Sequence, residues 1–331
     1  MNGLGFQASI FDFNGDLRPD IYVANDFGST IQRNVLWRND GSTMTNVSAT
    51  SKANFALSSM GVGVGDFNRD GYPDLAVSNI GPNVLARGSS TGVFTDVART
   101  SGAQRSTVFQ NGTANRSVTW GLDFSDLNDD GYEDLMIAGG RLRSNESVPD
   151  AVLVNNLSGH LTGSASDGTF LDLTYAAGLS VTTGRTLAFA DFNGDGYPDV
   201  YEQNYFNEPS QLYLNQGPAD GNTNHWLEVR LVGAGPAPLG GLAHGSNADG
   251  IGARLVLTSA SGKQYQQIVD GGSLGAGNQL AAHFGLGPDT NVTSLEIDWP
   301  SGYVQTFTNL AADQRDVITE GSSLIDHDPT P

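Results

Sequence analysis

The sequence contains no cysteine, and Lys52 and Lys263 are its only lysines. Without cysteine the chain can form no disulfide, no thiolate metal site and no cysteine nucleophile. Basic residues are scarce as well, because 16 Lys and Arg face 36 Asp and Glu and leave a formal net charge of −20. Proteins that bind nucleic acid neutralise phosphates with a basic surface. We therefore expect no nucleic-acid partner.

Long apolar segments are also missing. No run approaches the roughly 20 apolar residues that a helix needs to cross a bilayer, so we expect no membrane span. The first five residues have neither the positive charge nor the apolar core of a secretory signal peptide. If the protein is exported, we expect that its signal lies outside this chain or has been removed.

The dominant feature that is present is a nine-residue stretch that occurs four times. Its copies are DFNGDLRPD at 12–20, DFNRDGYPD at 66–74, DLNDDGYED at 126–134 and DFNGDGYPD at 191–199. Each copy places an oxygen-bearing side chain at positions one, three, five and nine. Alternating oxygen ligands on a tight loop suit a hard cation that takes six to eight oxygens at about 2.3–2.6 Å. The pattern therefore predicts calcium, with up to four ions in the chain.

In each loop we predict that the residue at position seven contributes only its backbone carbonyl. The predicted ligands are Asp12, Asn14, Asp16, Arg18 and Asp20 in the first loop, Asp66, Asn68, Asp70, Tyr72 and Asp74 in the second, Asp126, Asn128, Asp130, Tyr132 and Asp134 in the third, and Asp191, Asn193, Asp195, Tyr197 and Asp199 in the fourth.

Two other interpretations of the loops fit the sequence less well. Asp, Asn and Gly are ordinary turn residues, but a plain turn does not account for four copies that keep every ligand position. An EF-hand loop has twelve residues, closes with Glu and lies between helices. Here position twelve is Val23, Val77, Ile137 or Glu202 and the flanks resemble strands. Position six is glycine in the last three loops, whereas Leu17 makes the first loop the weakest candidate.

The loops mark a repeat. Asp12, Asp66, Asp126 and Asp191 are 54, 60 and 65 residues apart. The first three periods each contain four short apolar runs bounded by Gly, Asn, Asp and Pro, which is typical of strands, and the fourth lacks the last run. Four strands in a period of about 50–60 residues predict a β-propeller blade, with the loop joining the first two strands. The residues at position two are expected to pack between blades: Phe13, Phe67, Leu127 and Phe192.

With GVGVGDFN or LAFADFN leading into them, the loops resemble the FG-GAP/VCBS repeats of integrin α-chain propellers. The resemblance covers about residues 1–215, and it implies calcium in the loops and a ring that usually has seven blades. We expect the four repeats to belong to a longer propeller or to be completed by neighbouring chains. Open ends of such an array would expose strand edges to a partner.

The composition changes at Gly217. Period-two alternation at 254–257, 265–269, 295–299 and 304–307 predicts half-buried strands, and the run 310–314 resembles a short turn of helix. The strings GIGAR, HFGLG and WPSG resemble the ASPIC/UnbV domain, which follows FG-GAP/VCBS repeats in the cartilage acidic protein 1 family. The resemblance implies a second β domain, which we expect to be a sandwich.

The predicted fold class is all-β, with propeller blades followed by a β-sandwich-like domain. The expected domain limits are propeller repeats over 1–216, with blades at about 1–55, 56–110, 111–180 and 181–216, a linker at 217–224, the ASPIC/UnbV-like domain at 225–321 and a tail at 322–331.

No catalytic pattern stands out, so we expect no enzyme. The histidines are His160, His225, His244, His283 and His327, and no two lie at the spacing of a local metal site. We interpret His283 as a hydrogen-bonded strand residue and Trp299 as a core residue, with a sugar platform of Trp299 and Tyr303 as the less favoured alternative. Acid–base pairs for glycoside chemistry meet only in the fold, so the sequence leaves that alternative open.

Calcium loops of modest affinity operate where calcium is abundant, which favours an extracellular location, secreted or at the cell surface. The sequence therefore predicts a calcium-stabilised adhesion, interaction or structural scaffold. The expected partner is a protein or glycan ligand at the cell surface or matrix, with self-association as a further candidate. The alternatives are a carbohydrate-binding lectin or carbohydrate-active enzyme, and a subunit of a self-assembling surface filament.

Overall fold

The computed structural model describes residues 3–105, 107–110, 113–140, 149–157, 161, 169–179, 183–205, 207–217 and 221–327. Its regular structure is built from 25 strands, and the described part of the chain contains no α-helix. The described residues accordingly include no helix that could span a membrane. His160 lies outside the described residues.

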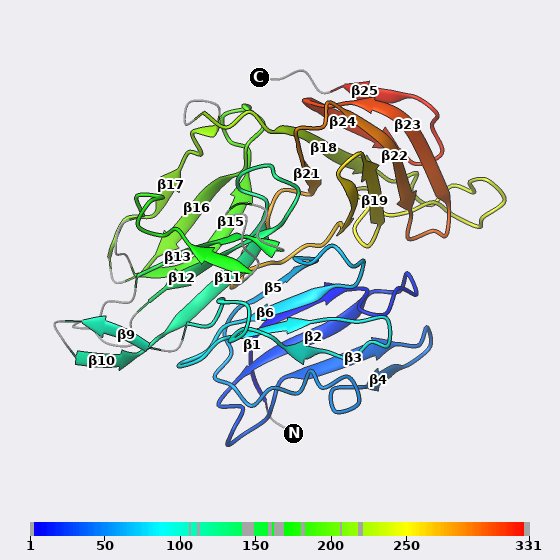
Figure 1. Ribbon diagram of the computed structural model, residues 1–331. Coiled ribbons are helices and arrows are strands. Elements are labelled where there is room, and N and C mark those ends of the chain that lie inside the picture. The colour runs from blue at the N-terminus through cyan, green and yellow to red at the C-terminus, as the bar shows by residue number, and fades with distance from the viewer. Residues whose placement is uncertain are drawn as a thin grey trace.

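The repeats form four antiparallel sheets in which strands follow one another in chain order (Figure 1). Every predicted run became a strand, and the last sheet has three strands where the others have four, as the sequence predicted. The strands are β1 (Leu4–Phe11), β2 (Asp20–Asp26), β3 (Val35–Asn39) and β4 (Met44–Asn46); β5 (Val62–Gly65), β6 (Asp74–Val77), β7 (Val84–Arg87) and β8 (Thr95–Asp96); β11 (Thr119–Ser125), β12 (Asp134–Gly139), β13 (Ala151–Asn155) and β14 (Phe170–Asp172); and β15 (Gly184–Ala190), β16 (Asp199–Asn204) and β17 (Gln211–Tyr213).

The sheets are propeller blades placed side by side. Their innermost strands are neighbours in the order β1, β5, β11 and β15. The second and third blades are connected through a hairpin of β9 (Thr107–Gln110) and β10 (Thr113–Arg116), an insertion that the repeat pattern did not predict.

Aromatic side chains at position two of the loops fill the space between blades, as the repeat pattern predicted for the first two copies. Phe13 lies 6.4 Å from Phe94 of the next blade, between ring centroids, and Phe67 lies 5.7 Å from Phe170. The prediction is wrong for Phe192, which is 52% exposed. Among the described strands no further blade follows the fourth, so no blade covers the side of the fourth blade on which Phe192 lies exposed.

Both ends of the array of blades expose apolar side chains. On β1, Leu4, Phe6 and Ile10 alternate with buried residues and face outward. On the last blade, Tyr201 and Leu212 are paired across β16 and β17 and are also exposed. In a propeller these faces pack against neighbouring blades, so the array presents two uncovered inter-blade faces.

The C-terminal domain consists of two four-stranded sheets that enclose one core. Trp299 lies fully buried in that core, which confirms the core interpretation. The strand orders are β21-β18-β24-β25 and β20-β19-β22-β23, and β18 and β24 are parallel. The strands are β18 (His225–Val232), β19 (Arg254–Ser259), β20 (Gly262–Gln267), β21 (Ala281–Gly287), β22 (Asn291–Asp298), β23 (Val304–Ala311), β24 (Gln314–Thr319) and β25 (Ile325–His327).

The predicted helical turn at 310–314 is wrong. Leu310 and Ala311 extend β23 and pair with β22, and Asp313 takes a left-handed conformation (φ 58°) just before β24 begins. The helix-forming residues of this run are overridden by sheet pairing on both sides.

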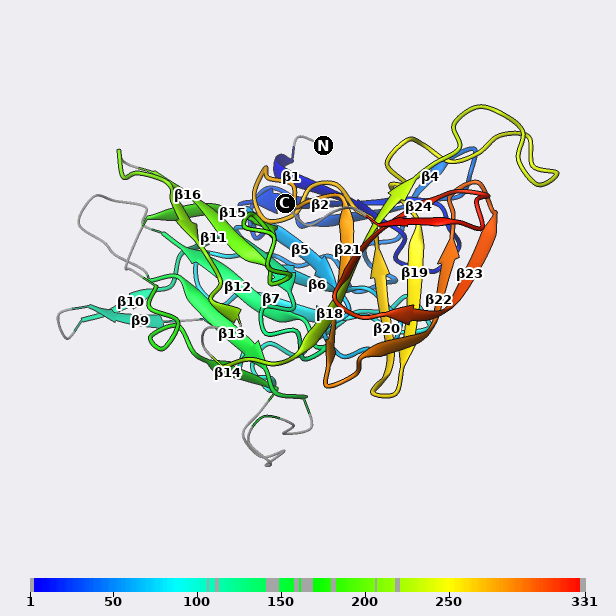
Figure 2. The same cartoon turned by 90° about the horizontal axis from the view of Figure 1, so that it is seen from above.

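The C-terminal domain lies against the blades rather than apart from them, with β20 and β21 facing the strands of the second and third blades (Figure 2). This contact brings strands from the last third of the sequence onto the four acidic loops.

Candidate metal-binding loops

The four acidic loops share one backbone geometry. In each, the carboxylate at position one accepts hydrogen bonds from the backbone N–H groups of positions five and six. For Asp66 the two N···O distances are 3.1 Å to Asp70 and 2.8 Å to Gly71, and for Asp126 they are 3.1 Å to Asp130 and 2.7 Å to Gly131. The loop is thus wound around its first carboxylate.

Left-handed backbone at two positions produces this winding. Position six has positive φ in all four loops, at Gly71, Gly131, Gly196 and also Leu17 (φ 61°). The first loop therefore adopts the shared turn although leucine pays a steric cost that glycine avoids. Position four has positive φ as well, a requirement that the sequence did not reveal because the residues there differ: Gly15, Arg69, Asp129 and Gly194.

Oxygens from positions one, three and five gather on the inside of the turn. The backbone N–H of Asp70 lies 3.1 Å from Asp66 Oδ1 and 3.2 Å from Asn68 Oδ1, so both oxygens face the same donor. The Asn68 amide then donates to Asp70 Oδ2 at 2.9 Å. The third and fourth loops repeat both features.

Position nine has a different and structural role. Asp74 accepts the N–H of Phe67 at 3.1 Å and that of Gly88 at 2.7 Å, which ties the loop to the third strand of the blade. The same two bonds recur at Asp20, Asp134 and Asp199, and all four side chains belong to fully buried residues. The sequence placed these residues among the ligands and missed their function as strand-linking acceptors.

The geometry of the four loops indicates how well their predicted ligands fit calcium. Among the described residues, no group of three Asp, Glu, His or Cys side chains converges as a metal site would require. Positions one, three and five supply the oxygen donors that calcium prefers, whereas position nine is held by backbone donors. The ligand set therefore fits in part, and the assignment of calcium to these residues stays a prediction.

The second and third loops, called the inner loops below, bury unneutralised carboxylates. Burial raises the pKa of Asp66 to about 7, with the nearby Asp70 carboxylate adding to the effect. Burial also raises the pKa values of Asp74, Asp126 and Asp134 well above the ordinary range. Within the described chain, no Lys or Arg forms an ion pair with Asp66 or Asp126. A bound cation would relieve both the burial cost and the mutual repulsion.

The first and fourth loops, called the outer loops below, each have an arginine on a carboxylate. In the first loop Arg18 contacts Asp16 at 2.6 Å, and both side chains are accessible to solvent. In the fourth loop Arg315 of β24 pairs with Asp191, whose side chain is only 2% exposed. The outer loops therefore already contain a positive charge from the protein.

Contacts with the C-terminal domain fix all four loops. Gln267 donates to the Asp12 carbonyl at 2.8 Å and accepts the Asp12 N–H at 3.0 Å. Arg69 donates to the Lys263 carbonyl at 2.9 Å. His283 Nε2 lies 2.6 Å from Asp129 Oδ1, which confirms its interpretation as a hydrogen-bonded strand residue.

Of the histidines that the structure describes, His283 is the one buried between the two domains. Burial alone would lower the pKa of His283, but the Asp129 carboxylate outweighs it and raises that pKa. The contacts of His283 and Gln267 join residues 154 and 255 positions apart, so no local pattern could have revealed them.

The segment 221–224, within the predicted linker, is attached to the third loop. Asn222 and Asn224 both donate to the Asn128 carbonyl, at 2.6 and 2.8 Å. Tyr197 of the fourth loop donates to the Asn224 carbonyl at 3.0 Å. These bonds fix the path by which the chain leaves the blades.

Comparison with known proteins supports this architecture. An FG-GAP-like repeat profile matches residues 12–77, 66–137 and 126–202, and an ASPIC and UnbV profile matches residues 243–325. The chain is also 24% identical to cartilage acidic protein 1 of Xenopus tropicalis, over 91% of this chain and 52% of that protein. It thus spans about half the length of that curated relative.

Solved structures are more distant. A lectin of Agrocybe aegerita, described as recognising non-reducing terminal N-acetylglucosamine, has 16% sequence identity and a TM-score of 0.34 over 68% of this chain and 56% of its own. The biofilm matrix protein Bap1 of V. cholerae has 10% identity and a TM-score of 0.31 over 98% of this chain and 61% of its own. Neither similarity adds to the functional argument. From the match of the repeat profile to more than half of its residues, the chain belongs to the FG-GAP-like repeat family, with an ASPIC and UnbV domain after the repeats.

Proposed function

We propose that the protein is a calcium-binding extracellular module for adhesion or structural interaction, without catalytic activity of its own. The observation that carries the proposal is the pair of inner loops, where Asp66 and Asp126 are buried with raised pKa values and form no ion pair with a Lys or Arg among the described residues. The FG-GAP-like repeats and the similarity to cartilage acidic protein 1 support an extracellular, adhesion-type role.

Calcium would act by stabilising the blades. Asp66, Asn68 and Asp70 would hold the ion in the second loop, and Asp126, Asn128 and Asp130 in the third. The ion supplies positive charge beside carboxylates that are otherwise costly to bury. Because the assembled loop exists only in the folded chain, its binding free energy adds to the free energy of unfolding.

The partner surface in this proposal is the pair of uncovered inter-blade faces. Leu4, Phe6 and Ile10 form one face, and Tyr201 and Leu212 form part of the other. Exposed apolar faces of this kind are typical of protein-interaction sites. Contact with a cell-surface or matrix protein, or with another copy of the chain, would cover them.

Calcium-dependent stability tests the proposal. Chelated protein and protein in excess calcium should differ in melting temperature, since calcium at 100 times its Kd contributes about 2.7 kcal/mol per site. Asp70→Ala and Asp130→Ala should each reduce this shift, whereas Asp16→Ala should leave it nearly unchanged. The proposal is wrong if calcium produces no shift in the unmodified protein.

The role of the inter-blade faces in binding a partner is tested separately. Light scattering in calcium should show self-association, or pull-down with cell-surface extract should recover a partner, and Phe6→Ser combined with Leu4→Ser should reduce either signal. Leu324→Ser is a matched control, because Leu324 is 73% exposed but belongs to the C-terminal domain and not to an inter-blade face. Equal loss with the control would remove the inter-blade faces from the proposal.

A further inference from the structure

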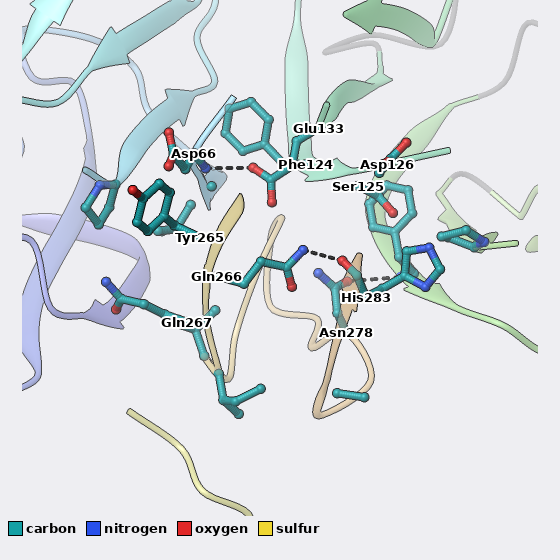
Figure 3. Close-up of a pocket in the computed structure, with 18 of the residues that line it drawn as sticks. Asp66, Phe124, Ser125, Asp126, Glu133, Tyr265, Gln266, Gln267, Asn278 and His283 are labelled. Carbon is teal, nitrogen blue, oxygen red and sulfur yellow. Dashed lines mark hydrogen bonds between the residues drawn. The ribbon is translucent and has the colours of Figure 1, made fainter. Parts of the chain in front are cut away.

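A cavity of about 130 Å³ lies between the second to fourth blades and the C-terminal domain (Figure 3). Its blade side includes Phe124 and Glu133, and its other side includes Tyr265, Gln266 and His283. Figure 3 shows Glu133 beside Phe124, with its carboxyl directed into the space that Gln266 faces from the opposite side. The cavity therefore exists only when both domains are in contact.

The polar atoms left over inside the cavity are mainly acceptors. Glu133 Oε2 accepts the Asp66 N–H at 2.6 Å, and no described residue donates a hydrogen bond to Oε1. Gln266 and Gln279 use their amide nitrogens on the His283 carbonyl and the Glu228 carboxylate, so their oxygens remain for an occupant. An occupant that satisfies these three oxygens must donate hydrogen bonds.

Two other amides of the lining are already engaged through both their nitrogen and their oxygen. Asn278 donates to Asp123 and accepts the Phe189 N–H, each at 3.0 Å. Gln267 both donates to and accepts from the Asp12 backbone. These two side chains shape the cavity, and the nitrogen and the oxygen of each amide already make one hydrogen bond.

Charge in the cavity points the same way. Glu133 is the acidic side chain of the lining that is not a predicted metal ligand, and the two basic residues of the lining are engaged elsewhere. Arg254 lies 3.7 Å from Asp298 and above the Tyr265 ring, and His283 is paired with Asp129. A positive occupant would therefore be favoured.

The size and walls of the cavity define the rest of the occupant. Val64, Phe124, Phe189 and Ile268 contribute apolar surface beside the acidic end. A cavity of about 150 Å³ holds benzene, with its six carbon atoms. The space thus suits a chain of about five non-hydrogen atoms, apolar along its stem and positive at its tip.

We propose that this interdomain cavity binds a primary ammonium group on an unbranched aliphatic stem, as found in a lysine side chain or a small alkylamine, with Glu133, Gln266 and Gln279 accepting its hydrogen bonds. The site is separate from the proposed calcium function, because none of these three residues is a predicted metal ligand. The contact between the two domains would then bind a ligand, in addition to holding the acidic loops in place.

Calorimetric titration of the full chain in calcium buffer tests the site. The probes are n-butylamine and Nα-acetyl-lysine methylamide, which separate a free amine from a peptide-borne one. Their uncharged counterparts are n-butanol and the Nε-acetylated lysine derivative. At least one amine should bind, and its counterpart should bind at least tenfold more weakly. Equal binding of both members of each pair would overturn the assignment of charge.

Variants locate the binding. Glu133→Gln keeps an acceptor for the Asp66 N–H but removes the negative charge, and it should weaken amine binding at least tenfold. Gln266→Met serves as a second variant if Glu133→Gln does not fold, with an expected loss of about threefold. Amine binding that survives both changes would place the site elsewhere.

Further controls separate this site from the calcium proposal. Asp70→Ala should reduce the calcium-dependent melting shift while leaving amine affinity within about twofold. Glu133→Gln should weaken amine binding while leaving the calcium-dependent melting shift nearly unchanged. Methyl glycosides serve as neutral polar probes. Binding of a glycoside in place of the amines, or displacement of the amines by calcium at one-to-one stoichiometry, would overturn the proposal without affecting the calcium test.

Discussion

The inner and outer loops have nearly the same sequence and turn geometry but differ in how their negative charge is balanced. In the outer loops an arginine lies on a predicted ligand carboxylate: Arg18 on Asp16 and Arg315 on Asp191. In the inner loops, Asp66 and Asp126 are buried with raised pKa values, and among the described residues neither is paired with an arginine. Repeats of one motif therefore need not be equivalent sites, because the surrounding chain decides where an arginine lies on a loop carboxylate.

The largest effect is expected from position nine. Asp134→Ala removes the acceptor for the buried N–H groups of Leu127 and Asn155, which cost about 1–3 kcal/mol each when left unpaired. We expect the free energy of unfolding in urea to fall by about 2–6 kcal/mol. Asp195→Ala, at an exposed carboxylate of an outer loop, is the control and should cost less than about 1 kcal/mol. Equal losses of free energy in the two variants would show that the hydrogen bonds accepted at position nine are not important for stability.

The next effect tests the arginine of the fourth loop. Arg315→Met leaves Asp191 buried without its partner, and breaking a fully buried pair costs about 3–5 kcal/mol. Because the Arg315 side chain is 14% exposed, we expect a loss of about 2–3 kcal/mol. The melting shift caused by calcium should also increase, since the loop becomes a site that needs a cation. Arg230→Met, at an exposed position of β18, should change neither quantity.

An unchanged calcium response in Arg315→Met would contradict the difference between inner and outer loops. A gain in the Arg230→Met control would show that the effect comes from overall charge and not from Asp191.

A smaller effect concerns pH in the absence of calcium. Burial raises the pKa of Asp123 from 3.8 to about 7 in the folded chain. Between these two pH values the folded protein keeps a proton on Asp123 that the unfolded protein has released. The contribution of this proton to the free energy of unfolding is therefore complete below about pH 4 and is lost as pH rises through about 7. Chemical denaturation between pH 4 and 7 should show stability falling, and Asp123→Asn should flatten the slope. A slope that Asp123→Asn leaves unchanged would assign the dependence to other groups.

The smallest effect is expected at Arg18. Its side chain is 47% exposed, and exposed ion pairs contribute about 0–1 kcal/mol. Arg18→Ala should therefore lower the melting temperature by no more than Arg38→Ala, which removes the similarly exposed pair with Asp40. A loss above about 2 kcal/mol would make the first loop as dependent on its arginine as the fourth.

Local sequence was sufficient for the blades and the turns. Apolar runs on either side of each loop became strands, and glycine at position six has the positive φ that its place in the motif implied. These features depend on residues close together in the chain. The same reasoning identified the fourth blade as lacking a strand, because its last apolar run is absent.

What the sequence could not predict depends on distant partners. Arg315 and Asp191 are 124 residues apart, and nothing near Arg315 indicates that it belongs to an acidic loop. Phe192 matches Phe13 and Phe67 in its motif position but lacks a neighbouring blade. Asp20 and its counterparts fit a ligand pattern, yet their oxygens accept backbone N–H groups that only the folded third strand supplies.

The seating of the C-terminal domain on the loops has a consequence for biosynthesis. Gln267 donates a hydrogen bond to the Asp12 backbone and accepts one from it, and it is synthesised 255 residues after Asp12. At about 5–20 residues per second, this interval is roughly 13–50 s. Throughout this interval the first acidic turn remains open to ions, because the strand that covers it has not yet been made.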